Sequence, residues 1–163
     1  MWRWLLVVGS MLSCVACTPV LSREVRALVD PHVTYADIAA NPEANIGKVL
    51  LAAGTIIEAE NLQQGTRLEI LQYPADSRGR PQTDQPSGGR FLILTPGYLE
   101  TTIYRPGRAI TVAGEVTGQQ ELSLGETAYR YPVLAPRELH LWQEGASFPP
   151  VHIGIGFGIR IRL

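Results

Sequence analysis

The two cysteines of this chain, Cys14 and Cys17, have the C-x-x-C spacing that serves redox or metal chemistry. A redox pair opens a helix within a thioredoxin-like βαβ pattern, and a zinc site needs further Cys or His ligands at matched spacing. No second cysteine pair follows, and the histidines are scattered, at His32, His140 and His152. A disulfide across so small a loop would be strained and would constrain little of the chain. We therefore expect neither a redox centre, nor a disulfide, nor a metal site.

The residues before the cysteines indicate a processing signal instead. One arginine is followed by the apolar run LLVVGSML, which is too short to cross a bilayer but suits the apolar region of a secretory signal. A small residue precedes each cysteine, as in bacterial lipoprotein signals, where the cysteine thiol receives a diacylglyceryl group. Signal length favours Cys17 as the acceptor, with Cys14 as the alternative.

This interpretation divides the N-terminal part of the chain into a signal peptide at 1–16 and a lipidated tether at 17–31. We expect diacylglyceryl and N-acyl groups on the N-terminal cysteine and no other cofactor. Thr18, rather than an aspartate, follows Cys17, which favours the outer membrane as the destination. The expected protein is held at a membrane by its lipid anchor, with its folded domain facing the periplasm.

A second set of residues could bind a ligand, since tyrosines can stack and arginines can pair with carboxylates or phosphates. The candidate residues are Arg78, Arg80, Arg90, Tyr98, Tyr129, Arg130 and Tyr131. The alternative is that the tyrosines pack at the rim of a barrel while the arginines pair with Asp76, Asp84 and Glu100. The formal charge of -1 and the charged fraction of 18% give no electrostatic case for nucleic acid. A glycan or an anionic envelope lipid is the expected ligand.

The elements that must position these residues are mostly strands. A short helix is expected to start with Thr34 as its N-cap and Asp37 as the capping-box partner, and to end at Asn41-Pro42. Runs of β-forming residues predict strands at 48–60, 66–73, 90–95, 108–118 and 128–142, the last of them either broken near its prolines or split in two. The polar segment 74–89 is predicted to be a mobile loop or an interaction surface.

Two of the strands resemble each other. IGKVLLAAGTI and PGRAITVAGEV align position by position and bring Gly54 into register with Gly114. A glycine inside a strand marks a bulge, a sharp bend or a close backbone approach, so two such strands could close a small antiparallel barrel. Five strands with a short helical connection after the third match the order of an OB-fold barrel, in which the first and fourth strands pair. We therefore predict a mainly β protein with a five-stranded OB-like barrel at 32–145; a simple antiparallel sandwich is the alternative.

The C-terminal segment has a pattern of its own. Residues 151–163, VHIGIGFGIRIRL, alternate apolar residues with His, Gly and Arg, which predicts an amphipathic strand-like tail at 146–163. Exposed, such a strand would promote aggregation, so it should add to a sheet edge of its own chain or of an envelope protein partner, or lie on the membrane.

The body of the chain also resembles a known family. Residues 33–142 carry NIGKVLLAAGTI, ENLQQGTRLEILQYP, DSRGRP, GGRFLI, PGYLE, YRPGRAITVAGEVTG and YRYPVLAPRELHLW, a series that is similar to the Slp (starvation-inducible) family of outer-membrane lipoproteins. The resemblance implies a lipid-anchored envelope protein in a family without a settled biochemical activity, and it implies no catalytic residues. No enzyme motif occurs in the chain. The expected function is that of a non-enzymatic envelope structural or interaction module; the alternative is an OB-like module that binds a glycan or an anionic envelope lipid.

Overall fold

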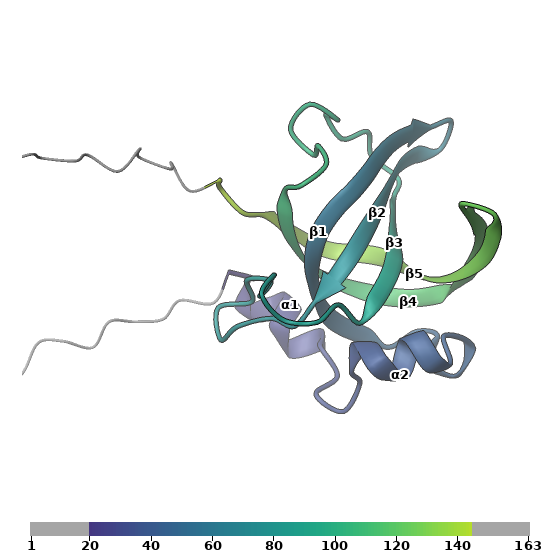
Figure 1. The fold of residues 1–163 in the computed structure, drawn as a ribbon. Helices are drawn as coiled ribbons and strands as arrows, with labels where there is room; N and C mark the ends of the chain where they lie inside the picture. Colours follow the sequence, from purple (N-terminus) through teal and green to yellow (C-terminus); the bar gives the residue numbers. More distant parts are fainter. Residues whose placement is uncertain (1–19, 145–163) are drawn as a thin grey trace, which may run out of the picture.

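The computed structural model describes residues 20–144, whose fold is shown in Figure 1. Its strands are β1 (Val49–Leu62), β2 (Gly65–Tyr73), β3 (Gly89–Thr95), β4 (Ala109–Leu124) and β5 (Thr127–Leu141). They close a barrel in the order β1-β2-β3-β5-β4, in which β3 and β5 are parallel and the other neighbours are antiparallel. The predicted mainly β fold with a five-stranded OB-like barrel is confirmed.

The last two strands are the longest elements of the molecule. β4 runs beyond its predicted end at 118 because it pairs with β5 as far as Leu124 opposite Thr127. β5 is one continuous strand despite its prolines, and the register shifts between Ala113 and Gly114, directly opposite Pro136. A bulge at this point lets the sheet accommodate a residue that cannot donate a ladder hydrogen bond. The β4–β5 hairpin therefore extends past the barrel as a curled ribbon (Figure 1).

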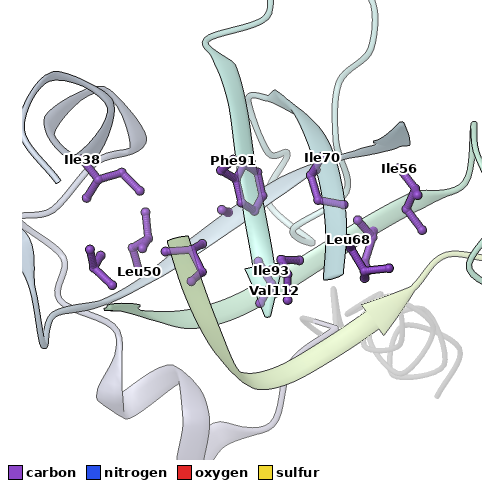
Figure 2. Packing of buried hydrophobic residues seen from close by; sticks show 12 residues of the cluster. Ile38, Leu50, Ile56, Leu68, Ile70, Phe91, Ile93 and Val112 are labelled. Carbon is purple, nitrogen blue, oxygen red and sulfur yellow. The ribbon is translucent and has the colours of Figure 1, made fainter. Parts of the chain in front are cut away.

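The barrel interior is filled by aliphatic and aromatic side chains from α2 and from the strands (Figure 2). In β2 buried and half-buried residues alternate: Leu68, Ile70 and Gln72 are buried and their neighbours are half-buried. The fully buried core residues include Ile38, Leu50, Leu68, Ile70, Phe91, Ile93, Ile110 and Val112. Their convergence at the barrel axis means that the interior is a packed core.

The two matching glycine strands are neighbours, as predicted. β1 pairs with β4 from Val49 opposite Glu115 to Thr55 opposite Ala109. A side chain at Gly54 would place its Cβ 2.2 Å from the carbonyl oxygen of Leu71, so only glycine allows β1 to approach β2 this closely. Gly114 lies at the register shift between β4 and β5. Both glycines thus serve the closure of the barrel.

The helices all precede the first strand. They are α1 (Arg23–Leu28), α2 (Tyr35–Ala40) and the 3-10 helix η2 (Glu43–Asn45). α2 has the predicted capping box, because the Thr34 hydroxyl accepts from the Asp37 amide while the Asp37 carboxylate accepts from the Thr34 amide at 2.8 Å. Its Ile38 is buried in the core cluster, so α2 covers one end of the barrel.

The connection between β3 and β4, residues 96–108, forms turns rather than a helix. The carbonyl of Glu100 accepts hydrogen bonds from the amides of Ile103 and Tyr104, and the side chains of Leu99 and Tyr104 pack against the core cluster. These turns take the place of the short helical connection expected after the third strand. The helix that packs on the core comes instead from the segment before β1.

Residues 20–31, predicted as part of a tether, lie against the barrel. Leu21 is buried, and the Ser22 amide and hydroxyl donate to the Glu138 carboxylate of β5, the hydroxyl at 2.7 Å. The amide of Val20 donates to the carbonyl of Arg78, and that of Asp30 to the carbonyl of Val49 at the start of β1. The chain is therefore attached to the barrel from residue 20 onward.

Several predictions from the sequence concern residues that lie outside the described range. These are the signal peptide at 1–16, the two cysteines Cys14 and Cys17, and the amphipathic tail at 146–163. None of the helices within residues 20–144 is long and apolar enough to cross a bilayer.

Candidate functional site

The structure divides the seven candidate ligand residues among four places. Arg90, Tyr129 and Tyr131 come together on β3 and β5, while Arg130 and Tyr98 lie apart from them and from each other. Arg78 and Arg80 belong to the loop between β2 and β3. The predicted single platform of stacking and charged groups is therefore not formed.

The first place is the Glu69 cluster, which consists of Tyr35, Glu69, Arg90, Tyr129 and Tyr131. Arg90 Nη1 donates to Glu69 Oε1 at 2.7 Å, and the Tyr131 hydroxyl donates to the same oxygen at 3.2 Å. The Tyr129 ring lies edge-on to the Tyr131 ring at 4.7 Å, and its hydroxyl accepts from the Arg90 amide. The Tyr35 hydroxyl donates to the Arg90 carbonyl at 3.0 Å. Each polar group in this cluster is held by another member.

The electrostatics of the Glu69 cluster agree with this pairing. The hydrogen bond to Glu69 raises the pKa of Arg90. Burial raises the pKa of Tyr131, and the nearby Glu69 carboxylate raises it further, while burial is also the main reason why the pKa of Tyr35 is raised. These groups keep their ordinary protonation states at neutral pH and are not poised for proton transfer.

The Glu69 cluster adjoins a small second core on the outer side of the barrel wall. Leu92 packs with Tyr131 and Val133, whereas its strand neighbours Phe91 and Ile93 belong to the main core, so Leu92 points outward. Leu122 and Tyr129, from the extended β4–β5 hairpin, pack against this second core. OB-folds bind oligonucleotides and oligosaccharides on the face formed by β2 and β3. Part of that face is covered here by the hairpin of the same chain.

Tyr98 and Arg130 occupy separate exposed positions. The Tyr98 side chain is 68% exposed, and its hydroxyl donates to the Gln63 carbonyl in the β1–β2 turn. Beside this turn is a groove of about 320 Å³, lined by residues that include Leu62, Leu94 and Pro96. Arg130 is exposed on the hairpin opposite Glu121. Neither residue joins the other candidates.

The loop that carries Arg78 and Arg80 is fastened to the barrel wall. Asp76 Oδ1 accepts from the amides of Arg78 and Arg80, both at 2.8 Å, and these backbone donors lower the pKa of Asp76. The Thr111 hydroxyl of β4 donates to the Gly79 carbonyl at 2.6 Å, and Gly79 itself is buried. The sequence predicted a polar segment outside the core, but this part of it packs against the barrel because Thr111 is a buried hydroxyl that needs an acceptor.

A pocket of about 220 Å³ lies between this loop and the end of β5, and we name it the Arg80 pocket. Its lining includes Thr55, Arg80, Thr83, Gly107, Trp142 and Glu144. The Arg80 guanidinium lies over the Trp142 ring, 5.3 Å from its centroid, and Trp142 Nε1 donates to the Thr111 hydroxyl at 2.8 Å. Arg80 and Trp142 are thereby fixed side by side.

Two further arginines border the Arg80 pocket. Arg105 Nη2 donates to the Glu144 carboxylate at 2.6 Å, and Arg108 donates through Nη2 to the Trp142 carbonyl at 2.8 Å. The Nε of Arg108 is buried without a hydrogen-bond partner among the described residues, and its distance to Glu144 Oε1 is 3.9 Å. Among the residues in and beside this pocket, Arg80 alone was predicted from the sequence as a ligand residue. The others come from the β3–β4 connection and the end of β5, and no local pattern links those segments.

Residues 20–144 contain no group of three His, Cys, Asp or Glu side chains that could hold a metal ion.

Comparisons with known proteins place the chain in a family. The model of the outer membrane lipoprotein Slp family matches residues 14–153. The chain is 30% identical over 112 residues to the uncharacterized lipoprotein YeaY of Escherichia coli K12 and 28% identical over 102 residues to an uncharacterized protein of Haemophilus influenzae. These matches cover 69% and 62% of the chain, and 58% and 55% of the two relatives.

Similar solved structures include the mitochondrial single-stranded DNA-binding protein Rim1 of S. cerevisiae, with a TM-score of 0.39 and 16% identity over 60% of this chain and 96% of that one. A small single-stranded DNA-binding protein of Streptomyces coelicolor has a TM-score of 0.35 and 12% identity over 57% of this chain and 92% of that one. The match of the family model over most of the chain shows that this protein belongs to the Slp family of outer membrane lipoproteins.

Proposed function

We propose that the protein is a non-enzymatic module of the outer membrane, acylated at Cys17 and held with its barrel directly against the periplasmic side of the bilayer. It serves as a structural or interaction element of the envelope. Family membership supports the lipid anchor, and the attachment of residues 20–31 to the barrel supports a position of the barrel close to the bilayer.

The observation that carries this proposal is the hydrogen bond from the Val20 amide to the Arg78 carbonyl, together with the burial of Leu21. Thr18 and Pro19 alone separate Val20 from Cys17. An extended chain covers at most about 3.3–3.6 Å per residue, so this link reaches roughly 10 Å. A barrel on so short a link cannot stand away from the membrane.

The anchor itself is strong enough for permanent attachment. Each buried methylene of an acyl chain contributes about 0.8 kcal/mol, and two or three chains on one cysteine anchor a protein stably where a single chain does not. Exposed arginines on α1, Arg23 and Arg26, follow closely after Val20 and suit a surface near lipid phosphates.

Both ends of the described chain lie on the same side of the barrel. Val20 contacts the loop that carries Arg78, and Trp142 contacts Arg80 of the same loop. Figure 1 shows the two ends leaving on that side, opposite the tip of the β4–β5 hairpin. The amphipathic tail at 146–163 would therefore begin close to the anchor, where it can contact the membrane or an envelope protein partner.

A partner other than nucleic acid fits these features best. The near-neutral net charge gives no general electrostatic case for nucleic acid, and on the β2–β3 face Arg67 and Arg90 are paired with Glu60 and Glu69. Nucleic-acid binding depends on releasing counterions through many free cations. Partner capture from envelope extract, with and without residues 149–163, tests whether the tail takes part.

Mass spectrometry of the protein extracted from membranes tests the anchor. We expect a chain that begins at Cys17 and carries one diacylglyceryl and one N-acyl group, and we expect Cys17→Ala to abolish it. Cys14→Ala is the matched control and should leave the modification in place. An unmodified, soluble protein would refute the proposal, and a chain that begins at Cys14 would move the anchor away from Val20.

The second candidate function is the binding of an anionic envelope lipid or a glycan. The Arg80 pocket favours it, because Arg80 lies there over the Trp142 ring while Arg105 and Arg108 bond to its lining residues Glu144 and Trp142. A tryptophan fluorescence titration of the acylated protein tests this candidate, and a glycan or lipid that produces no saturable change in Trp142 emission argues for a purely structural role.

A further inference from the structure

We infer that the Arg80 pocket binds the phosphate headgroup of an anionic membrane lipid. This inference rests on the proposed function, because the acylated Cys17 is what would bring the pocket to a bilayer. It names the ligand class and the residues that would hold it.

The charge around the pocket is the first observation. Arg80 and Glu144 both line the pocket, and the Glu144 carboxylate also lies 2.6 Å from Arg105 Nη2 and 3.9 Å from Arg108 Nε. Within residues 20–144 no carboxylate or carbonyl pairs with the Arg80 guanidinium, which lies over the Trp142 ring. The site therefore has an excess of positive charge that a phosphate can compensate.

The second observation is the unpartnered Nε of Arg108. It is buried, and a buried donor without an acceptor costs about 1–3 kcal/mol. The nearest anionic oxygen belongs to Glu144, at 3.9 Å, which is beyond hydrogen-bond length. A phosphate oxygen bound in place of the Glu144 carboxylate could supply the missing acceptor.

The contacts of Glu144 indicate which ligand groups these arginines can bind. Its carboxylate oxygens accept from Arg105 Nη2 at 2.6 Å and stand in for two of the oxygens that a phosphate would present. Glu144 is 55% exposed and lies at the rim of the pocket, so a ligand with more charge can displace it. Guanidinium groups bind carboxylate and phosphate with the same paired donors.

The position of the pocket identifies the source of the phosphate. Val20 bonds to the carbonyl of Arg78, two residues before Arg80 in the same loop, so the pocket lies next to the segment that leads to the anchor. Trp142 lines it, and tryptophan is enriched at the headgroup level of bilayers. A neutral glycan would leave the excess positive charge uncompensated, so a lipid phosphate fits better.

The test uses the full acylated protein in detergent micelles. Trp142 is the only tryptophan outside the predicted signal peptide, so its fluorescence reports on the pocket. A short-chain phosphatidic acid is titrated, with phosphatidylcholine of the same chain length and inorganic phosphate as parallel titrations. We expect a saturable change with phosphatidic acid and none with phosphatidylcholine at the same concentrations.

Two variants should shift the affinity in opposite directions. Arg80→Gln removes a charged donor and should weaken binding roughly tenfold. Glu144→Gln removes the competing carboxylate and should tighten it roughly two- to fivefold. Arg137→Gln is the matched control, because Arg137 lies on β5 and pairs with Glu115 outside the pocket; it should leave the affinity unchanged.

Three outcomes would overturn the inference. The first is the absence of a saturable change with phosphatidic acid. The second is an equal response to inorganic phosphate, which would show that free phosphate is the ligand. The third is a loss of affinity in Glu144→Gln, which would make Glu144 part of the binding site instead of a competitor.

This test is independent of the anchor. If the protein is acylated but its Trp142 fluorescence does not respond to phosphatidic acid, the inference is refuted and the proposed function is unaffected. If the protein carries no acyl groups, the proposed function is refuted. The titration in micelles still reports whether the pocket binds the headgroup.

Discussion

Glu69 joins two strands that are far apart in the sequence, because one of its oxygens accepts from Arg90 of β3 and from Tyr131 of β5. β3 and β5 share a ladder of two residue pairs, Leu92 with Val133 and Ile93 with Leu134. A carboxylate that bridges strands at the shortest ladder of the barrel stabilises its closure. These contacts give the Glu69 cluster a structural role in the barrel.

We predict that Glu69→Gln lowers the free energy of unfolding by about 1–3 kcal/mol, because it replaces a charged hydrogen bond in a site where the Glu69 side chain is 15% exposed. Chemical denaturation of the detergent-solubilised protein measures the change. Glu60→Gln is the control, since Glu60 pairs with Arg67 at an exposed position and should change stability by no more than about 0.5 kcal/mol. Equal effects of the two variants would contradict the structural role of Glu69.

We predict that Gly54→Ala destabilises the barrel by about 1–3 kcal/mol, the range typical of overpacking. The added Cβ would lie 2.2 Å from the Leu71 carbonyl oxygen and 2.6 Å from the Ile70 side chain, so β1 and β2 must separate. Thermal unfolding measures the loss. At Gly97 no atom lies within 4 Å of the corresponding position, and Gly97→Ala should be nearly neutral; a neutral Gly54→Ala would show that the strands do not approach this closely.

Contacts between residues that are close in the sequence could be predicted, whereas contacts between distant residues could not. Thr34 and Asp37 lie three positions apart, so the capping box is visible in the sequence, and the glycine match indicated that β1 and β4 pair. The partners of Arg90 and Trp142 come from other strands or loops, and their contacts depend on the register of the closed barrel. This is why the predicted set of seven ligand residues divides among four places.

At the scale of elements, the segments outside the strands define the side of the barrel that bears the candidate site. The 74–88 loop is held by Asp76 and by Thr111, and it carries Arg80 to Trp142 at the end of β5. The segment 20–31 attaches beside it. The sequence predicted the existence of both segments but not their attachment, because the Thr111 hydroxyl, the Glu138 carboxylate and the backbone carbonyls that hold them come from segments distant in the sequence.

The Asp76 contacts predict how the loop responds to acid. The pKa of Asp76 is lowered in the folded protein, chiefly by the Arg80 amide, so its contribution to loop stability is fully present above the ordinary aspartate pKa of about 3.9 and is lost as the pH falls through the lower folded value. NMR titration of the Arg78 and Arg80 amides should give a midpoint below about 3.9. Asp76→Asn should abolish this titration, and a midpoint at or above the ordinary value would contradict the hydrogen bonds.

At the scale of the whole molecule, the two ends of the described chain and the Arg80 pocket lie on one side of the barrel, and the tip of the β4–β5 hairpin lies on the opposite side (Figure 1). If Cys17 is acylated, this asymmetry fixes which side faces the lipid. In the proposed arrangement the short attached segment orients the barrel, and the exposed hairpin and the groove near Leu62 would face the periplasm.

Fluorescence quenching by lipids that carry a nitroxide on the headgroup tests this orientation most directly. The acylated protein is reconstituted in vesicles, and the quenching of Trp142 is compared with that of a tryptophan at position 126 on the hairpin tip, introduced by Glu126→Trp together with Trp142→Phe. We predict strong quenching of Trp142 and weak quenching at position 126. Equal quenching at the two positions, or stronger quenching at the hairpin tip, would contradict a barrel held against the membrane by its Cys17 side.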